Sequence, residues 1–197
     1  MRAAVAVSLV ALSCASRPPC AAGRVCGAAT WATGPATDDR LVLLSTIDVG
    51  VPDESPGVRE SIPLRRGSAF LRFDLSSVPR GARVSRALLA LSPHPTFTPS
   101  PSAARLRVRL VADGWSSESV ARGDLPSTRD DRGAELTLPA GQRSGARVDV
   151  TAAVRAWVDG SAASEGLALE CDHRGAAFVG AGALATSLRP RIELEVR

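Results

Sequence analysis

The sequence contains no lysine and no tyrosine, so all 24 of its basic residues are arginine. Aromatic residues make up only 4% of the chain. The formal net charge is +4, but the 20 acidic residues are interspersed among the basic ones. A nucleic-acid-binding surface is normally a concentrated basic patch with groove-reading or base-stacking elements. The composition therefore argues against nucleic acid as a partner and is compatible with an anionic ligand.

Motifs of covalent catalysis are also missing. The only two histidines, His94 and His173, have no sequence neighbours typical of a catalytic triad, and there is no Gly-x-Ser-x-Gly elbow. Asp74 and Glu118 would act as paired acids in glycoside hydrolysis only at a defined separation. We therefore expect a protein that is not an enzyme, with a polysaccharide hydrolase or lyase as the remaining catalytic alternative.

No apolar run in the N-terminal part of the chain is long enough to span a bilayer. Met1–Ser13 has one charge, Arg2, followed by the apolar run Ala3–Leu12, which is too short to span a bilayer and is typical of a signal peptide. Residues 14–40 are small and polar, and we interpret them as a flexible tether. Cleavage before Cys14 predicts either a bacterial lipoprotein, lipidated on that thiol, or a freely secreted protein.

We accordingly expect a monomer that is secreted or lipid-anchored at the bacterial cell surface or periplasm, touching membrane only through such an anchor. Outside the cytoplasm we expect Cys20 and Cys26 to form a small disulfide loop, which would leave Cys171 without a partner, or to stay free thiols; metal binding is the remaining alternative, but no matching His or Cys pair follows them. We predict no cofactor. The adjacent pairs Asp38-Asp39 and Asp130-Asp131 could supply Ca²⁺ ligands, but such pairs more often form turns.

The segment Ala69–Leu91 has the clearest pattern in the chain. In its first half Leu71 and Phe73 alternate with Arg72 and Asp74, and in its second half Ala87, Leu89 and Leu91 fall on one side. This period of two indicates strands with one buried face. The connection between them contains Pro79, which cannot continue a strand ladder. Two successive strands are therefore predicted, and their apolar faces require a second layer.

Similar patterns predict the rest of the fold. In Thr151–Val158 the apolar period becomes helical, with Asp149 or Thr151 as the cap and Gly160 as the stop. Other segments read as strands: Leu41–Ile47, Arg105–Val111, Ala134–Leu138, Gly166–Cys171 and Leu188–Arg197. The stretches between them read as loops: Gly50–Arg66, Ser92–Ser102, Trp115–Pro126 and Arg129–Arg132. We predict an all-β fold over residues 41–197, an antiparallel jelly-roll β-sandwich with one short helix.

Several blocks stand in a fixed order along this predicted sandwich. They are Ala69–Ser77 with Ala87–Leu91, Trp115-x-x-Glu118-x-Val120 with Pro126, Val148–Trp157 with Gly160 and Gly166–Leu169, and finally Phe178 and Arg189-Pro190-Arg191. The ordered set resembles the DNRLRE-domain family, which is grouped with the family 96 carbohydrate-binding modules. The resemblance implies an extracellular, non-catalytic β-sandwich module attached to exported proteins. It also implies binding of acidic, alginate-like polysaccharide.

The candidate ligand-binding residues follow from this expectation. Arg105, Arg107 and Arg109 project from one strand face and Arg72 from another, and guanidinium groups can grip carboxylates through two parallel hydrogen bonds. The alternative for the arginines is an ordinary solvated strand face, which we favour. Trp115 can stack on sugar or anchor its loop, and Glu118 can bind hydroxyls or fix the same loop. The alternative function is a structural or adhesive surface domain that binds another protein.

Overall fold

The computed structural model describes residues 40–56, 59–64, 67–79 and 81–197, all of which fall in one compact unit, Thr37–Arg197. The predicted signal peptide, most of the predicted tether and the three cysteines Cys14, Cys20 and Cys26 lie outside the described residues. The predictions about them stay predictions. No helix in the described part of the chain has the length and apolarity needed to cross a membrane.

Ten strands form the body of the molecule: β1 (Arg40–Gly50), β2 (Ser61–Pro63), β3 (Ser68–Phe73), β4 (Val84–Leu91), β5 (Ala104–Val111), β6 (Thr128–Leu138), β7 (Ala146–Asp149), β8 (Leu167–Cys171), β9 (Ala177–Val179) and β10 (Arg191–Val196). The long strands follow the order β6-β5-β8-β3-β1-β10-β4-β7, and every pair is antiparallel. The short β2 and β9 pair with each other.

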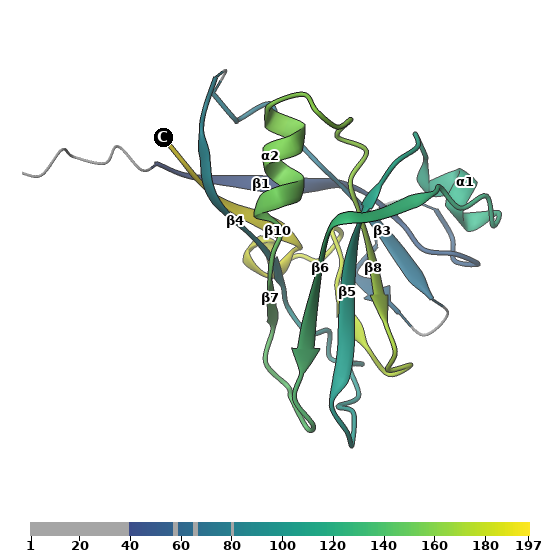
Figure 1. Cartoon of the computed structure of the whole chain (residues 1–197). Helices are drawn as coiled ribbons and strands as arrows, with labels where there is room; N and C mark the ends of the chain where they lie inside the picture. Colours follow the sequence, from purple (N-terminus) through teal and green to yellow (C-terminus); the bar gives the residue numbers. More distant parts are fainter. Residues whose placement is uncertain (1–39, 57–58, 65–66, 80) are drawn as a thin grey trace, which may run out of the picture. The chain divides into compact units, whose positions relative to one another are not determined.

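Strand β1 divides this order into two layers. Its first half, Arg40–Ser45, pairs with β10, whereas its second half pairs with β3. The register shifts between Thr46 and Asp48, and a bulge of this kind bends a strand. We call β1-β10-β4-β7 sheet 1, and β3-β8-β5-β6 with the end of β1 sheet 2. In Figure 1, β10 and β4 lie to the left of β3, β8 and β5.

The connectivity is that of a jelly roll. If the eight long strands are numbered in chain order, sheet 1 reads 1-8-3-6 and sheet 2 reads 2-7-4-5. This arrangement contains the two Greek keys of the jelly roll. The predicted fold class, an all-β antiparallel sandwich, is confirmed.

The core lies between the two sheets and contains the residues that the alternation assigned to it. Leu71 and Phe73 of β3, Leu89 of β4, and Ile192 and Leu194 of β10 are each at most 3% exposed. The strands β3 and β4 do not pair with each other, because the chain crosses from sheet 2 to sheet 1 between them. Each strand thus supplies the second layer that the apolar face of the other requires.

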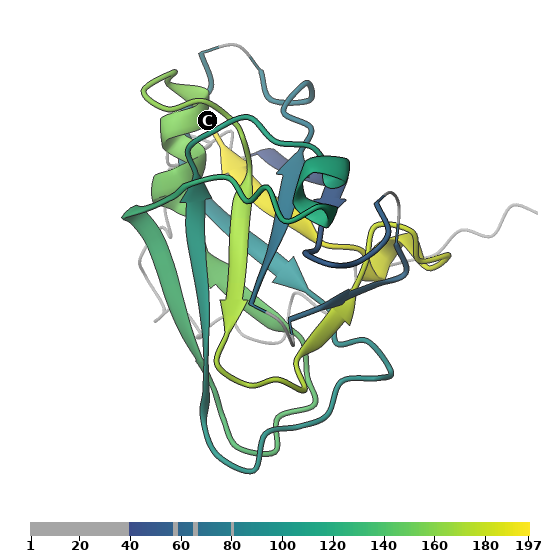
Figure 2. The ribbon, with the colours of Figure 1, turned by 90° about the vertical axis from the view of Figure 1, so that its right-hand side faces the viewer.

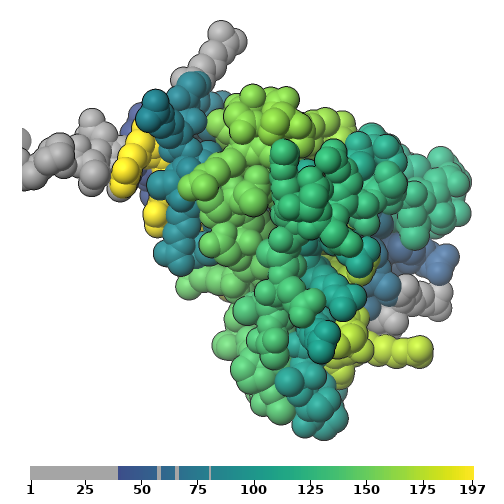
Figure 3. Space-filling model, in the orientation of Figure 1, coloured from purple at the N-terminus to yellow at the C-terminus, as the bar shows by residue number. Residues whose placement is uncertain are grey.

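Helix α2 (Thr151–Val158) has the predicted bounds. The carboxylate of Asp149 accepts a hydrogen bond of 2.9 Å from the backbone N–H of Thr151, and Gly160 follows the helix with φ +76°. Trp157 is only 7% exposed on the inner face of the helix. Helix α2 lies against β4 and also contacts β6, so it closes one end of the sandwich (Figures 1 and 3).

Six further elements differ from the sequence predictions. A second helix, α1 (Ser117–Ala121), and a 3₁₀ turn, η1 (Thr186–Leu188), occur where no helix was predicted. The short strands β2, β7 and β9 were also missed, and β6 runs through Arg129–Arg132, which was predicted to be a turn. A five-residue helix is too short to show a helical period. It is instead specified by a capping box, in which Ser116 and Ser119 satisfy each other's backbone N–H groups.

Candidate functional site

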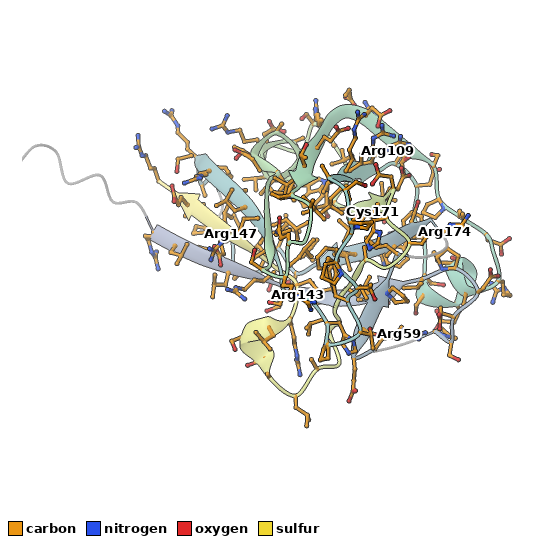
Figure 4. The ribbon with its side chains drawn as sticks, turned by 90° about the horizontal axis from the view of Figure 1, so that it is seen from below. Arg59, Arg109, Arg143, Arg147, Cys171 and Arg174 are labelled. Carbon is orange, nitrogen blue, oxygen red and sulfur yellow. The ribbon has the colours of Figure 1, made fainter. Side chains whose placement is uncertain are left out.

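The three arginines of β5 form a row on the outer face of sheet 2. Leu106, Val108 and Leu110 point into the core, so Arg105, Arg107 and Arg109 project outward. Strand β6 flanks this row on one side and β8 on the other. Figure 2 shows these neighbouring strands facing the viewer, and in Figure 4 the labelled Arg109 and Cys171 mark the adjacent strands β5 and β8.

Acidic residues from the flanking strands pair with this row. Arg107 Nε lies 3.1 Å from Glu135 of β6, and Arg105 Nε lies 3.9 Å from the same carboxylate. The Arg105 and Arg107 side chains are 61% and 47% exposed, so these ion pairs contribute little to stability. Two guanidinium groups therefore share one carboxylate at the exposed end of the row.

Arg109 is held differently. Its guanidinium lies 2.9 Å from Asp130 and 3.6 Å from Glu170, and its side chain is only 28% exposed. The Nε atom that approaches Asp130 lacks good hydrogen-bond alignment, so the contact is an ion pair without a hydrogen bond. With a carboxylate on each side, Arg109 is the least available of the three to an external anion.

Two shallow hollows flank Arg107. One, of about 390 Å³, lies between β5 and β6; the other, of about 380 Å³, lies between β5 and β8. The second hollow is lined by Gly67, Ser68, Arg105, Arg107, Glu170, Cys171 and Asp172. Both volumes are at the lower end of the range for small-molecule sites, about 300–1,000 Å³.

The hollow between β5 and β8 has donors on one wall and acceptors on the other. The exposed guanidiniums of Arg105 and Arg107 supply the donors. Across from them lie the carboxylates of Glu170, which accepts from the Ser68 hydroxyl at 3.1 Å, and of Asp172, which accepts from the Arg105 backbone N–H at 2.8 Å. Both carboxylates keep lone pairs for further donors.

Arg72 lies apart from this row, beside Trp115. Its Nη2 donates to the Trp115 carbonyl at 2.7 Å and lies 3.3 Å from Glu165. The guanidinium carbon stands 4.7 Å from the centre of the Trp115 ring, which is cation–π distance. The structure therefore does not bring Arg72 together with the β5 arginines.

Trp115 is buried, with only 8% of its surface exposed. Its indole N–H donates to the Glu165 carbonyl at 2.7 Å, and its ring packs on Phe70 at 5.8 Å between centroids. Val111, Val120 and Ala168 complete a second small core with them on the outer face of sheet 2. These contacts anchor the loop that carries α1, and they leave no open ring face for stacking on a sugar.

Glu118 lies in the first turn of α1 and is exposed. Its own backbone N–H and the Ser116 hydroxyl lower the pKa of its carboxyl. A carboxylate at this position favours helix formation, because it faces the unpaired N–H groups of the first turn. Glu118 thus supports the loop that Trp115 anchors. It lines neither of the two hollows beside the β5 arginines.

The described part of the chain contains no cluster of metal-ligating side chains. No group of three or more His, Cys, Asp or Glu side chains there could hold a metal ion. Asp131 pairs with Arg129 at 3.2 Å, and burial raises the pKa of the Cys171 thiol. Asp74 accepts from the backbone N–H and the hydroxyl of Ser76, as in an ordinary turn.

The acidic half of the candidate site was missed by sequence reasoning. Glu135 alternates with the inward-facing Ala134 and Leu136, and Glu170 follows the buried Leu169, so their outward positions could be read from the pattern. Their position beside Arg107 could not be predicted from the pattern, because it depends on which strands pair and in which register. No protein-family model matches the chain, and no curated protein is significantly similar to it. The likeness to DNRLRE domains therefore stays a prediction.

Proposed function

We propose that this protein is a non-catalytic carbohydrate-binding module and that the hollow between β5 and β8 binds one acidic sugar unit of a polysaccharide. The observation that supports this is the pair Arg105 and Arg107. Both are about half exposed or more, share a single carboxylate, and line one wall of a hollow whose other wall holds Glu170 and Asp172.

The charges of this hollow suit a uronate. The lining of the hollow is neutral overall, with two guanidiniums, Arg105 and Arg107, and two carboxylates, Glu170 and Asp172. The two signs lie on opposite walls, so a planar guanidinium on one wall can donate two parallel bonds to a sugar carboxylate. The opposite carboxylates, Glu170 and Asp172, accept hydrogen bonds from hydroxyl groups on the other edge of the ring. A uronic acid carries both kinds of group.

The site offers no aromatic platform. Every tryptophan and phenylalanine in the described part of the chain is at least partly buried, with Trp115 and Trp157 in the buried class. Affinity must then come from ionic hydrogen bonds at a partly exposed surface, where salt screens the interaction. We expect weak binding by one domain that falls as ionic strength rises.

The family resemblance and the N-terminal leader motif support the same proposal. A polysaccharide-binding module acts outside the cytoplasm, and Met1–Ser13 has the pattern of an export signal. We propose that the mature protein is secreted or held at the cell surface through Cys14, and that it supplies adhesion to acidic glycans and no chemistry.

The test is a binding titration of the full chain against polyuronates and matched neutral glucans at low and moderate salt. The double substitution Arg105→Ala/Arg107→Ala should lower polyuronate affinity by about tenfold or more, because two charge-assisted contacts are lost. The control, Arg122→Ala/Arg143→Ala, removes the same charge from exposed positions outside the hollow and should bind normally.

Equal losses in the two double variants would mean that only net charge matters, and unchanged binding in the first would remove the hollow from consideration. If the chain binds no glycan at either salt concentration, the adhesive, protein-binding alternative is favoured. Release of reducing ends from polyuronates would instead show an enzyme.

A further inference from the structure

Exposed apolar side chains lie along β1 and along the segment just before β10, and these two segments meet at Leu43 and Thr46. Six large hydrophobic side chains are exposed among the described residues, and only Leu125 lies elsewhere, near α1. The other five belong to β1 and to the segment before β10, and we call them the leucine face: Leu41, Leu43, Ile47, Leu184 and Leu188. Leu184 is 94% exposed. Scattered exposed leucines need no explanation, but a cluster of this kind marks a contact surface.

A hollow joins the two segments. It has a volume of about 470 Å³ and is lined by Leu43, Ser45, Thr46, Thr186, Ser187, Arg189, Pro190 and Arg191. No acidic residue lines it, and four of its residues carry hydroxyl groups. In Figure 4 the segment with η1 stands at the margin of the molecule, next to the strands of sheet 1.

The two arginines brace this segment and give the hollow its charge. Arg189 Nε donates to the Ala183 carbonyl at 2.9 Å, and Arg191 donates to the Ser187 carbonyl. Arg191 also pairs with Glu193 at 2.9 Å, whereas Arg189 forms no ion pair with any described residue. Other acids near the leucine face are Glu195, opposite Leu41 in the strand register, and Asp48, which follows Ile47 in β1, but neither lines the hollow. The hollow itself is therefore basic.

We propose that the leucine face rests on an anionic lipid surface. The leucines enter the interfacial region of the bilayer, and a lipid phosphate enters the hollow, where it meets the Arg189 guanidinium, which forms no ion pair with a described residue, and the surrounding hydroxyl groups. Apolar side chains beside basic ones are the combination by which proteins lie on membranes without spanning them.

The position of this face favours a membrane over a partner protein. Strand β1 begins at Arg40, directly before Leu41, and 39 residues precede it. Any attachment through that N-terminal part therefore leads into the leucine face before any other part of the sandwich. A basic hollow without acids further matches a surface of phosphate groups, whereas a second copy would bring an identical basic hollow against it.

The test is a co-sedimentation assay of the full chain with vesicles of phosphatidylglycerol and phosphatidylcholine, and with vesicles of phosphatidylcholine alone. Leu184→Ser should lower the partition coefficient by about tenfold, because one leucine no longer leaves water. Leu125→Ser removes another exposed leucine, from the loop that follows α1, and should change nothing. Both side chains are exposed, so both variants should fold. All variants share the same N-terminus, so its own contribution cancels.

Arg189→Gln should weaken binding to the phosphatidylglycerol vesicles and leave binding to phosphatidylcholine alone unchanged. The proposal is overturned if Leu184→Ser and Leu125→Ser bind alike, or if Arg189→Gln binds both kinds of vesicle normally. Sedimentation velocity supplies a further arm. A dimer that Leu184→Ser dissociates, with vesicle binding intact, would make the leucine face an interface between two copies.

Discussion

Replacing Trp115 by alanine should destabilise the domain by about 3–5 kcal/mol, the usual cost of removing a large buried aromatic side chain. Three interactions of the Trp115 side chain would be lost, and together they account for this destabilisation. The indole is buried against Phe70, its N–H donates to the Glu165 carbonyl at 2.7 Å, and its ring carries the Arg72 guanidinium at 4.7 Å. Because the whole stability of a domain is about 5–15 kcal/mol, the effect should be large.

The conservative change Trp115→Phe separates the hydrogen bond from the packing. It keeps an aromatic ring but removes the bond to Glu165, so we expect a loss of about 1 kcal/mol beyond the change in packing. Trp157→Phe is the matched control. Trp157 is equally buried, but its Nε1 has no hydrogen-bond partner in the described structure, so its replacement loses no such bond.

Urea unfolding followed by circular dichroism measures each free energy of unfolding. Polyuronate binding by Trp115→Phe should equal that of the unsubstituted chain, because Trp115 does not line the hollow that holds Arg105 and Arg107. If Trp115→Ala costs less than about 1 kcal/mol, or if the two Phe variants lose equal stability, Trp115 is not the anchor of its loop. Loss of binding without loss of stability would give it a direct role in ligand contact.

Three further predictions concern the scaffold. Gly166→Ala should lower the free energy of unfolding, measured with urea, by more than about 3 kcal/mol. Gly166 has φ +104°, and an added Cβ would lie 2.1 Å from the Leu71 carbonyl oxygen. A variant as stable as the unsubstituted chain would contradict that geometry. Asp149→Ala should cost about 1 kcal/mol at pH 7. The hydrogen bonds from Thr151 lower the pKa of the Asp149 carboxyl below 3.8. The stabilisation by the Asp149 carboxylate is therefore fully present above that pH and is lost as the pH falls through the folded-state pKa. If Asp149→Ala still destabilised the domain in strong acid, this linkage would be refuted. Ile192→Asp should prevent folding, because it buries an unpaired charge at a position that is 0% exposed, and an unaltered melting temperature would show that β10 is misplaced.

The outer face of sheet 2 shows where local patterns stop being informative. Phe70 shares the parity of Arg72 in β3 and so projects from the same face of the strand, but Phe70 is only 2% exposed. The loop that carries α1 covers it through Trp115 and Val120. A strand pattern reports which residues share a face. It does not report whether a distant loop will fold over part of that face.

The positions of most long strands, the inward residues of β3, β5 and β10, and helix α2 could be read from the chain alone, because the alternation of apolar and polar side chains is a local property. Which strands lie next to each other in the sheets could not be read from the chain in this way. Glu135 and Glu170 reach Arg107 from later strands, and the apolar run Leu41–Leu44 does not say which of its side chains turn inward. Those outcomes depend on strand order, register and the closing of one sheet over the other, which are set by contacts between residues far apart in the sequence.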